Sequence, residues 1–437
     1  MNLAAWKQVY KSPELRKKAL LVLGLLVIFR LLSHVPVPVS DNAAMARFLK
    51  TLFASNQLLG VANLFSGGAL TNFSIILMGV GPYINASIIM QLLQQVVPSL
   101  EALSKEGEAG REKINQYTRW LALPLALVQS VAMIFLIKQT SMRVANTDLI
   151  GSPAISQWAL MIITITAGSM LLMWLGELIT DRGIGNGISL IIFSGIVSQL
   201  PSSFGRIQAL VTGDSTKLYT LIPFIVAGLA VVYFVVMLNE GQRNIPISYA
   251  RRTRGTQAYG GVDTHLPLRV ITAGVIPIIF ALALLSIPGF ISQLFSNAQT
   301  VWLANFAKTL GTVFAQTSPW YATTYFVLVV VFTYLYTSIV FKPDEIAENL
   351  QKQGGFIPGI RPGNQTSAYL SKVLTRITLA GALGLGMLAI LPFIVERLSG
   401  TTTLTIGGTG LLIVVSVALE TMRQVESQAI TTAYEEY

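Results

Sequence analysis

Long apolar stretches that carry almost no charge recur along the chain. A helix that crosses a membrane needs about 20 consecutive apolar residues, and ten stretches approach that length. Arg30 interrupts the first, and we interpret it as a side chain that reaches the membrane interface. The ten predicted spans are residues 19–35, 74–93, 120–137, 159–177, 184–200, 221–238, 270–294, 322–341, 377–395 and 403–422.

The composition agrees with a polytopic membrane protein. The 437 residues are 53% hydrophobic and only 11% charged, whereas soluble domains carry about 25% charged residues. Lys and Arg are concentrated in the segments that lie on the same side of the membrane as the N-terminus. The positive-inside rule therefore places both termini in the cytoplasm. The first apolar stretch lacks a small-residue cleavage site, which predicts no cleavable signal peptide.

The second and seventh spans share a motif. Residues 79–84 and 274–279 both follow the pattern G-V-x-P-x-I, and the fifth and tenth spans both open on a G-x-G sequence, at 185–187 and 408–410. Each pair lies five spans apart, and halves with an odd number of spans are inverted relative to each other. We therefore predict an all-α membrane protein of ten helices in two inverted five-helix halves around a central pore.

Pro82 and Pro277 occupy equivalent places in this repeat, and we expect them to kink a pair of helices that flank the pathway. The repeat also sets the predicted domain boundaries. These are an N-terminal cytoplasmic segment (1–18), a first half (19–200), a second half (201–422) with long cytoplasmic loops at 240–269 and 342–376, and a C-terminal cytoplasmic tail (423–437).

No charged residue lies between Lys50 and Glu101, a run too long for one span. Its first part, residues 56–71, mixes apolar residues with Asn, Gln, Ser and Gly, and predicts a short helix that ends at Gly67-Gly68. A half-helix inside a cavity and a simple helix in an external loop both fit this pattern.

Residues for catalysis are missing. The chain has no cysteine, and its two histidines, His34 and His265, are far apart in the sequence. Carboxylates lie at the span ends, which argues against an ion-coupled transporter but leaves a facilitator open. Signatures of intramembrane proteases and of nucleotide-binding loops are also absent. We predict no catalytic residue, metal site or cofactor.

Two cytoplasmic loops carry a different pattern. Ile245, Ile247 and Tyr249 alternate with polar residues, which predicts an extended ribbon. Residues 343–350 predict a short amphipathic helix, followed by a Pro/Gly-rich turn at 354–363. Basic residues at exposed tips bind phosphate groups or acidic protein surfaces. The candidate docking residues are Arg251, Arg252 and Arg254 at the ribbon tip and Arg361 in the turn.

The sequences of these two loops resemble those of a known protein family. The sequences I-P-I-S-Y-A-R-R at 245–252 and P-D-E-I-A-E-N-L with G-G-F-I-P-G-I-R-P-G at 343–363 resemble cytoplasmic loops four and five of the SecY family, the channel of the general protein translocase. The resemblance covers residues 14–425. Further matching segments are 65–70, 81–84, 173–177, 182–189 and 265–268.

The resemblance implies a pore that is closed by a hydrophobic ring and a plug helix. It also implies a lateral gate, with spans two and three on one side and spans seven and eight on the other. A hydrophobic ring narrows the pore, and a short plug helix closes it from outside. By motif position, the ring comprises Val80, Ile84, Ile188, Ile192, Ile279 and Ile413. The plug includes Leu59, Gly60, Asn63, Leu64, Phe65, Ser66, Gly67 and Gly68.

The resemblance also implies a function and partners. The expected function is a protein-conducting channel that passes unfolded secretory polypeptides and releases apolar segments sideways into lipid; the alternative is a facilitator or transporter of small solutes with an inverted repeat. The expected location is the bacterial cytoplasmic membrane. The expected partners are the small membrane subunits SecE and SecG, the motor ATPase SecA, the ribosome, signal sequences, nascent polypeptides and membrane lipid.

Overall fold

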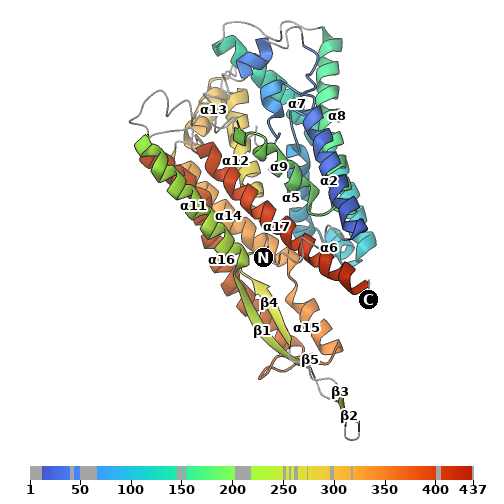
Figure 1. Ribbon diagram of the computed structural model, residues 1–437. Coiled ribbons are helices and arrows are strands. Elements are labelled where there is room, and N and C mark those ends of the chain that lie inside the picture. Colours follow the sequence, from blue (N-terminus) through green and yellow to red (C-terminus); the bar gives the residue numbers. More distant parts are fainter. Residues whose placement is uncertain are drawn as a thin grey trace.

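Helices dominate the structure, a computed structural model in which most helices lie side by side and a β-hairpin projects from one end of the bundle (Figure 1). The structure describes residues 12–39, 44–49, 66–144, 150, 154–201, 218–249, 252–254, 257–259, 264–272, 274–295, 300–315, 318–399 and 405–435.

A helix overlaps each of the ten predicted spans. These helices are α2 (Pro13–Leu32), α5 (Gly81–Val96), α7 (Glu108–Val144), α8 (Ile155–Arg182), α9 (Gly187–Val197), α11 (Leu218–Glu240), α12 (Ile276–Phe295), α14 (Pro319–Val340), α16 (Asn364–Ser399) and α17 (Thr405–Glu435). Shorter helices η1 (Ala69–Asn72), α6 (Pro98–Lys105), α13 (Val301–Val313) and α15 (Pro343–Lys352) connect them.

Not every predicted span is a long continuous helix. Within the described residues, 4 segments are long and apolar enough to cross a membrane: Glu108–Met142, Ile155–Arg182, Pro319–Lys352 and Asn364–Ile394. Three further apolar helices are shorter, at Gly187–Val197, Gly228–Glu240 and Ile276–Gly289. A helix of 16 residues such as α5 is about 24 Å long, less than the hydrocarbon core of about 30 Å.

Pro82 and Pro277 do not kink continuous helices, so that prediction was wrong. Pro82 lies in the first turn of α5, and Pro277 is the second residue of α12. Proline is favoured there because the first helical N–H groups have no partner within the helix and its φ already suits a helix. Three residues earlier, Gly79 and Gly274 have φ of 58° and 59°, which turns the chain sharply into each helix.

Glycines bring α8 and α9 into close contact. A Cβ atom on Gly187 would lie 1.9 Å from the carbonyl oxygen of Gly176, so only glycine fits there. The Asn186 side chain accepts a hydrogen bond from the backbone N–H of Ser189 and caps α9. This glycine-rich entrance to the predicted fifth span therefore packs closely against α8.

The outer faces of the bundle are apolar. Leu23 and Leu31 on α2, Ile163 on α8, Leu229 on α11 and Val327 on α14 are all at least half exposed. A soluble protein rarely exposes so many large apolar side chains on neighbouring helices, whereas lipid covers such faces in a membrane.

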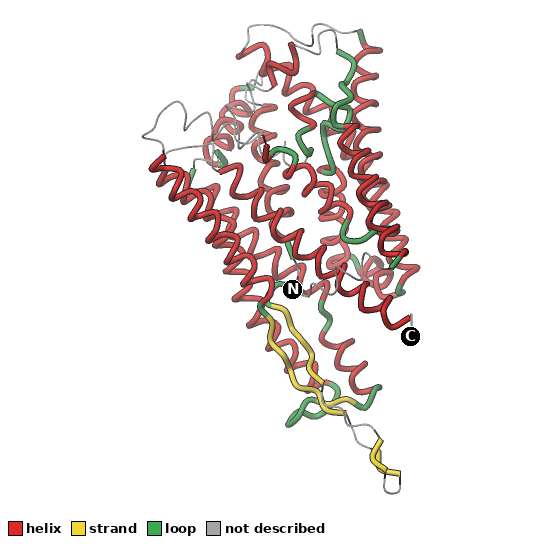
Figure 2. Tube along the Cα trace, viewed as in Figure 1, coloured by secondary structure: helices red, strands yellow, loops and turns green. Residues whose placement is uncertain are grey.

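The predicted ribbon is a three-stranded antiparallel sheet in the order β4 (Thr264–Arg269), β1 (Gln242–Tyr249) and β5 (Gly355–Phe356). Ile245 and Ile247 are buried as their alternation predicts, and Ile245 packs in a small core with Leu268 and Leu370. Strands β2 (Arg252–Arg254) and β3 (Gln257–Tyr259) form a second pair at the tip, and Figure 2 shows it farthest from the helices.

Candidate functional site

The six predicted ring residues belong to one hydrophobic core. Val80 precedes α5, Ile84 lies on α5, Ile279 on α12 and Ile413 on α17, while Ile188 and Ile192 lie on α9. Ile188 is half-buried and packs against this core, and the other five belong to it and are buried. The fold thus gathers aliphatic side chains from both predicted halves in the interior of the bundle.

Three of the predicted plug residues fall in the described part of the chain. Ser66, Gly67 and Gly68 form a turn that leads into η1, and the φ values of the two glycines are 65° and 86°. Leu59, Gly60, Asn63, Leu64 and Phe65 lie outside the described residues.

The turn at Gly67 has a partner that we did not predict from the sequence. The Arg30 guanidinium donates a hydrogen bond of 2.9 Å to the carbonyl oxygen of Gly67. Arg30 is thus bonded within the protein, a contact that its interpretation as an interface side chain did not include. The sequence offered one signal, a charge near the far end of the first apolar stretch.

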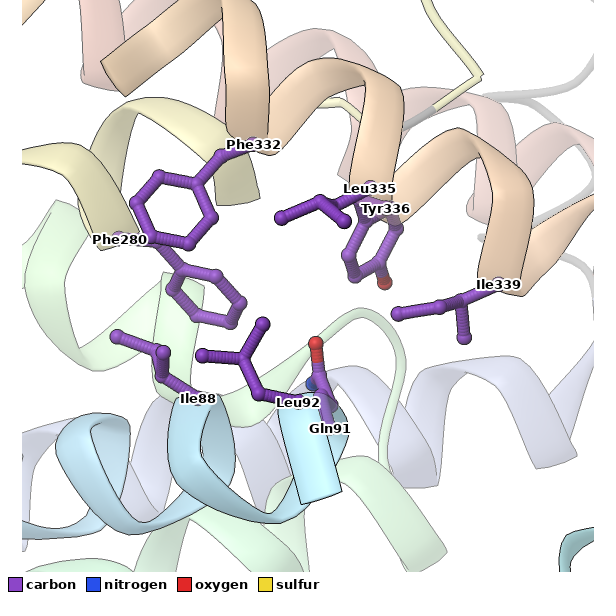
Figure 3. Close-up of a pocket in the computed structure, with 8 residues that line it drawn as sticks. All are labelled: Ile88, Gln91, Leu92, Phe280, Phe332, Leu335, Tyr336 and Ile339. Carbon is purple, nitrogen blue, oxygen red and sulfur yellow. The ribbon is translucent and has the colours of Figure 1, made fainter. Parts of the chain in front are cut away.

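A shallow apolar groove lies where α5 faces α12 and α14 (Figure 3). Phe280 packs edge-on against Phe332, with ring centroids 6.0 Å apart, and against Tyr336 at 6.5 Å. Gln91 and the Tyr336 hydroxyl are its polar groups. The lining residues are Ile88, Gln91, Leu92, Phe280, Phe332, Leu335, Tyr336 and Ile339. Apart from these two polar groups, the lining is aliphatic and aromatic.

None of these groove residues was predicted from the sequence. Ile88 and Phe280 are ordinary apolar residues of two helices that are distant in the chain, and no local pattern marks them as neighbours.

The predicted docking residues lie on the projecting part of the structure. Arg252 and Arg254 are the end residues of β2, and Arg251 lies outside the described residues. Arg361 is exposed and stands between Gly359 and Gly363, whose φ values are 82° and 94°.

The turn around Arg361 is well anchored. Ile357 is buried beneath it, and the Thr366 hydroxyl donates a hydrogen bond of 2.9 Å to the carbonyl oxygen of Arg361. The neighbouring helix α15 buries Ala347 and Leu350 and is bound to α16 by a hydrogen bond between Asp344 and Ser367. The predicted amphipathic helix and rigid turn are confirmed.

The fold is that of protein-conducting channels. A solved structure described as a protein-conducting channel aligns with 93% of this chain and 91% of its own, with a TM-score of 0.62 and 19% identity. Sec61 in the canine ribosome-channel complex from the endoplasmic reticulum aligns with a TM-score of 0.58 and 20% identity, over 93% of this chain and 91% of its own.

The chain belongs to the SecY family, whose profile matches residues 74–422. Protein translocase subunit SecY of Streptomyces scabiei is 42% identical over 99% of both chains. The SecY subunit of Mycobacterium bovis is 41% identical, again over 99% of both. The protein is therefore a multi-pass membrane protein and the non-enzymatic channel subunit of a protein translocase. The alternative of a small-solute facilitator is set aside.

Proposed function

We propose that unfolded polypeptides cross the membrane between two inverted five-helix halves, through the ring of Val80, Ile84, Ile188, Ile192, Ile279 and Ile413. The observation that carries this proposal is the convergence of these side chains from α5, α9, α12 and α17 in one buried core. The matched glycines before α5 and α12, with φ of 58° and 59°, support the inverted repeat. A collar of aliphatic side chains repels water and ions yet yields to a passing chain.

Crosslinking tests this path. The chain has no cysteine, so one introduced at Ile84, Ile188 or Ile279 is the sole thiol. A secretory polypeptide stalled in transit and carrying one cysteine is expected to form a disulfide with all three positions, because they line the path. Deleting its apolar signal segment should abolish the adducts.

Ile191 is the matched control for this experiment. It is as buried as Ile192 and adjacent to it on α9, but it is not one of the six predicted ring positions. A folded channel whose ring positions never react, or whose position 191 reacts as strongly, would contradict the path.

We propose that apolar segments, including signal sequences, bind the groove between α5, α12 and α14 and leave sideways into lipid there. Its lining is almost entirely aliphatic and aromatic, and Leu92 is 37% exposed in it. An apolar segment that covers Leu92 gains the free energy of removing both surfaces from water.

The Leu92→Asn variant is expected to bind a fluorescent signal peptide about tenfold more weakly, because one leucine contact of about 1.5 kcal/mol is lost. Leu93→Asn is the control, since Leu93 has the same 37% exposure on the same helix and does not line the groove. Equal affinities of the two variants in a titration would argue against the groove.

The projecting surface supports docking of cytoplasmic partners. The proposed docking residues are Arg251, Arg252, Arg254 and Arg361, and we assign the ribosome and the motor SecA to this surface. A channel related in fold is described in complex with a ribosome. Guanidinium groups suit both ribosomal RNA phosphates and carboxylates of a motor protein. SecE and SecG are the proposed membrane partners.

This assignment sets the location and topology. We place the chain in the bacterial cytoplasmic membrane, with the projecting sheet and both termini in the cytoplasm. The plug, around residues 56–70, would then lie on the outer side of the ring. The halves would span 19–200 and 201–422, between the N-terminal segment 1–18 and the tail 423–437, with the docking loops at 240–269 and 342–376.

A further inference from the structure

Arg30 lies in the last turn of α2, at the end of its apolar run, and its side chain is half-buried. A charge at membrane depth is costly unless it has a partner. The guanidinium donates to the backbone carbonyl oxygen of Gly67 at 2.9 Å, across 37 positions of sequence. The hydrogen bond therefore ties α2 to the turn that forms the end of the predicted plug.

The same turn is wedged between two helices. A Cβ atom on Gly67 would lie 2.4 Å from Cζ of Phe29, the neighbour of Arg30 on α2. On the other side, a Cβ atom on Gly195 of α9 would lie 2.3 Å from the Cα of Gly67. No side chain fits at either glycine, so the backbone of the turn lies directly against α9.

Gly195 lies on the same face of α9 as two ring residues. Residues three or four apart share one face of a helix, so Gly195 continues the line of Ile188 and Ile192, one turn beyond the ring. Gly67 therefore sits at the end of the stripe of α9 that carries two ring residues.

The residues after the turn are held separately. The Asn72 amide donates to the carbonyl oxygen of Ser33 at 3.3 Å, and the Ser74 hydroxyl donates to that of Leu32 at 2.7 Å. These bonds keep the chain beyond η1 attached to the end of α2 without Arg30. Loss of the Arg30 side chain should therefore loosen Gly67 from α2 and leave the rest of the segment in place.

We propose that Arg30 is a positioning residue that holds Gly67 against Gly195 and so keeps the resting channel sealed at the end of the ring. This inference rests on the proposed conduction path. Without the hydrogen bond, the turn leaves α9 more often, and the channel leaks ions while no polypeptide is being transported.

The test compares resting ion conductance and polypeptide export for the full chain assembled with its membrane partners. Arg30→Met keeps a long side chain but removes the donor, and should raise resting conductance about tenfold, the factor for one hydrogen bond from a charged donor. Export of an ordinary secretory protein should persist. Arg30→Lys, which keeps a charged donor, should leak less than Arg30→Met.

Two variants make the outcome decisive. Lys308→Met removes an exposed cation on α13 and should behave as the wild type. Gly67→Ala keeps Arg30 but meets Phe29 at a positive φ, and should leak as Arg30→Met does. A misfolded protein would lose export, whereas release of the turn raises conductance and preserves export.

The outcomes separate this inference from the proposed path. If Arg30→Met and Gly67→Ala conduct no more at rest than the wild type, while the wild type exports polypeptide, the positioning role of Arg30 is refuted and the proposed conduction path stands. If the wild type passes no polypeptide through the ring positions, the proposed conduction path is refuted, and the sealing role of Arg30 is refuted with it.

Discussion

The Ile192→Ala variant is expected to raise the resting ion conductance of the channel about tenfold. Ile192 is fully buried in the core that contains the other predicted ring residues. Alanine removes most of the aliphatic volume, and a narrow hydrophobic collar excludes ions because water does not wet it. Lowering that barrier by roughly 1.4 kcal/mol raises conduction about tenfold. Ile279→Ala on α12 should act in the same way.

Each variant has a control of equal burial. Ile191 and Ile278 are both 1% exposed and lie next to Ile192 and Ile279 in the same helices. Replacing either one by alanine creates a cavity that costs about 2–5 kcal/mol of stability, but leaves the ring intact. Conductance across a planar bilayer is the measurement. If Ile191→Ala leaks as much as Ile192→Ala, general loosening of the core explains the leak and the ring is misplaced.

The Arg361→Glu variant is expected to lose motor-driven export almost completely while it accumulates normally in the membrane. Arg361 is exposed on a turn that Ile357 and Thr366 hold in one conformation. A preorganised arginine loses little conformational entropy on binding, and truncation of such a central contact costs about 2–4 kcal/mol. Charge reversal adds repulsion from an acidic partner.

Export driven by SecA in vesicles is the measurement, with the amount of membrane-inserted protein recorded for each variant. Lys352→Glu is the control, because Lys352 is an exposed cation in the same loop that pairs with Glu348 at 2.7 Å. If both variants lose export equally, the total charge of the loop matters and Arg361 has no special role. Unchanged export by Arg361→Glu would remove its docking role.

Local patterns predicted the elements well. Each of the ten apolar stretches overlaps a helix, because the length of an apolar run and the cost of exposing backbone polar groups to lipid are properties of the segment alone. Of the described segments, however, only 4 are long and apolar enough to cross a membrane. The alternation of Ile245 and Ile247 likewise predicted a strand, since successive side chains in a strand point to opposite faces.

The prolines show where a local pattern was misapplied. Pro82 and Pro277 were expected to bend long helices, but they begin shorter ones. Proline is favoured in the first turn of a helix. Gly79 and Gly274, three residues before the two prolines, are visible in the sequence and together with them indicate a helix start.

The sequence by itself determined a membrane protein, its helices, the projecting ribbon and, through shared motifs, its family. Only the tertiary structure paired Arg30 with Gly67, Gly67 with Gly195, and Ile88 with Phe280 around a groove. Periodicity reports which face of a helix is apolar, but not which distant helix covers it. Those contacts depend on the packing of segments far apart in the chain, which no local pattern of residues encodes.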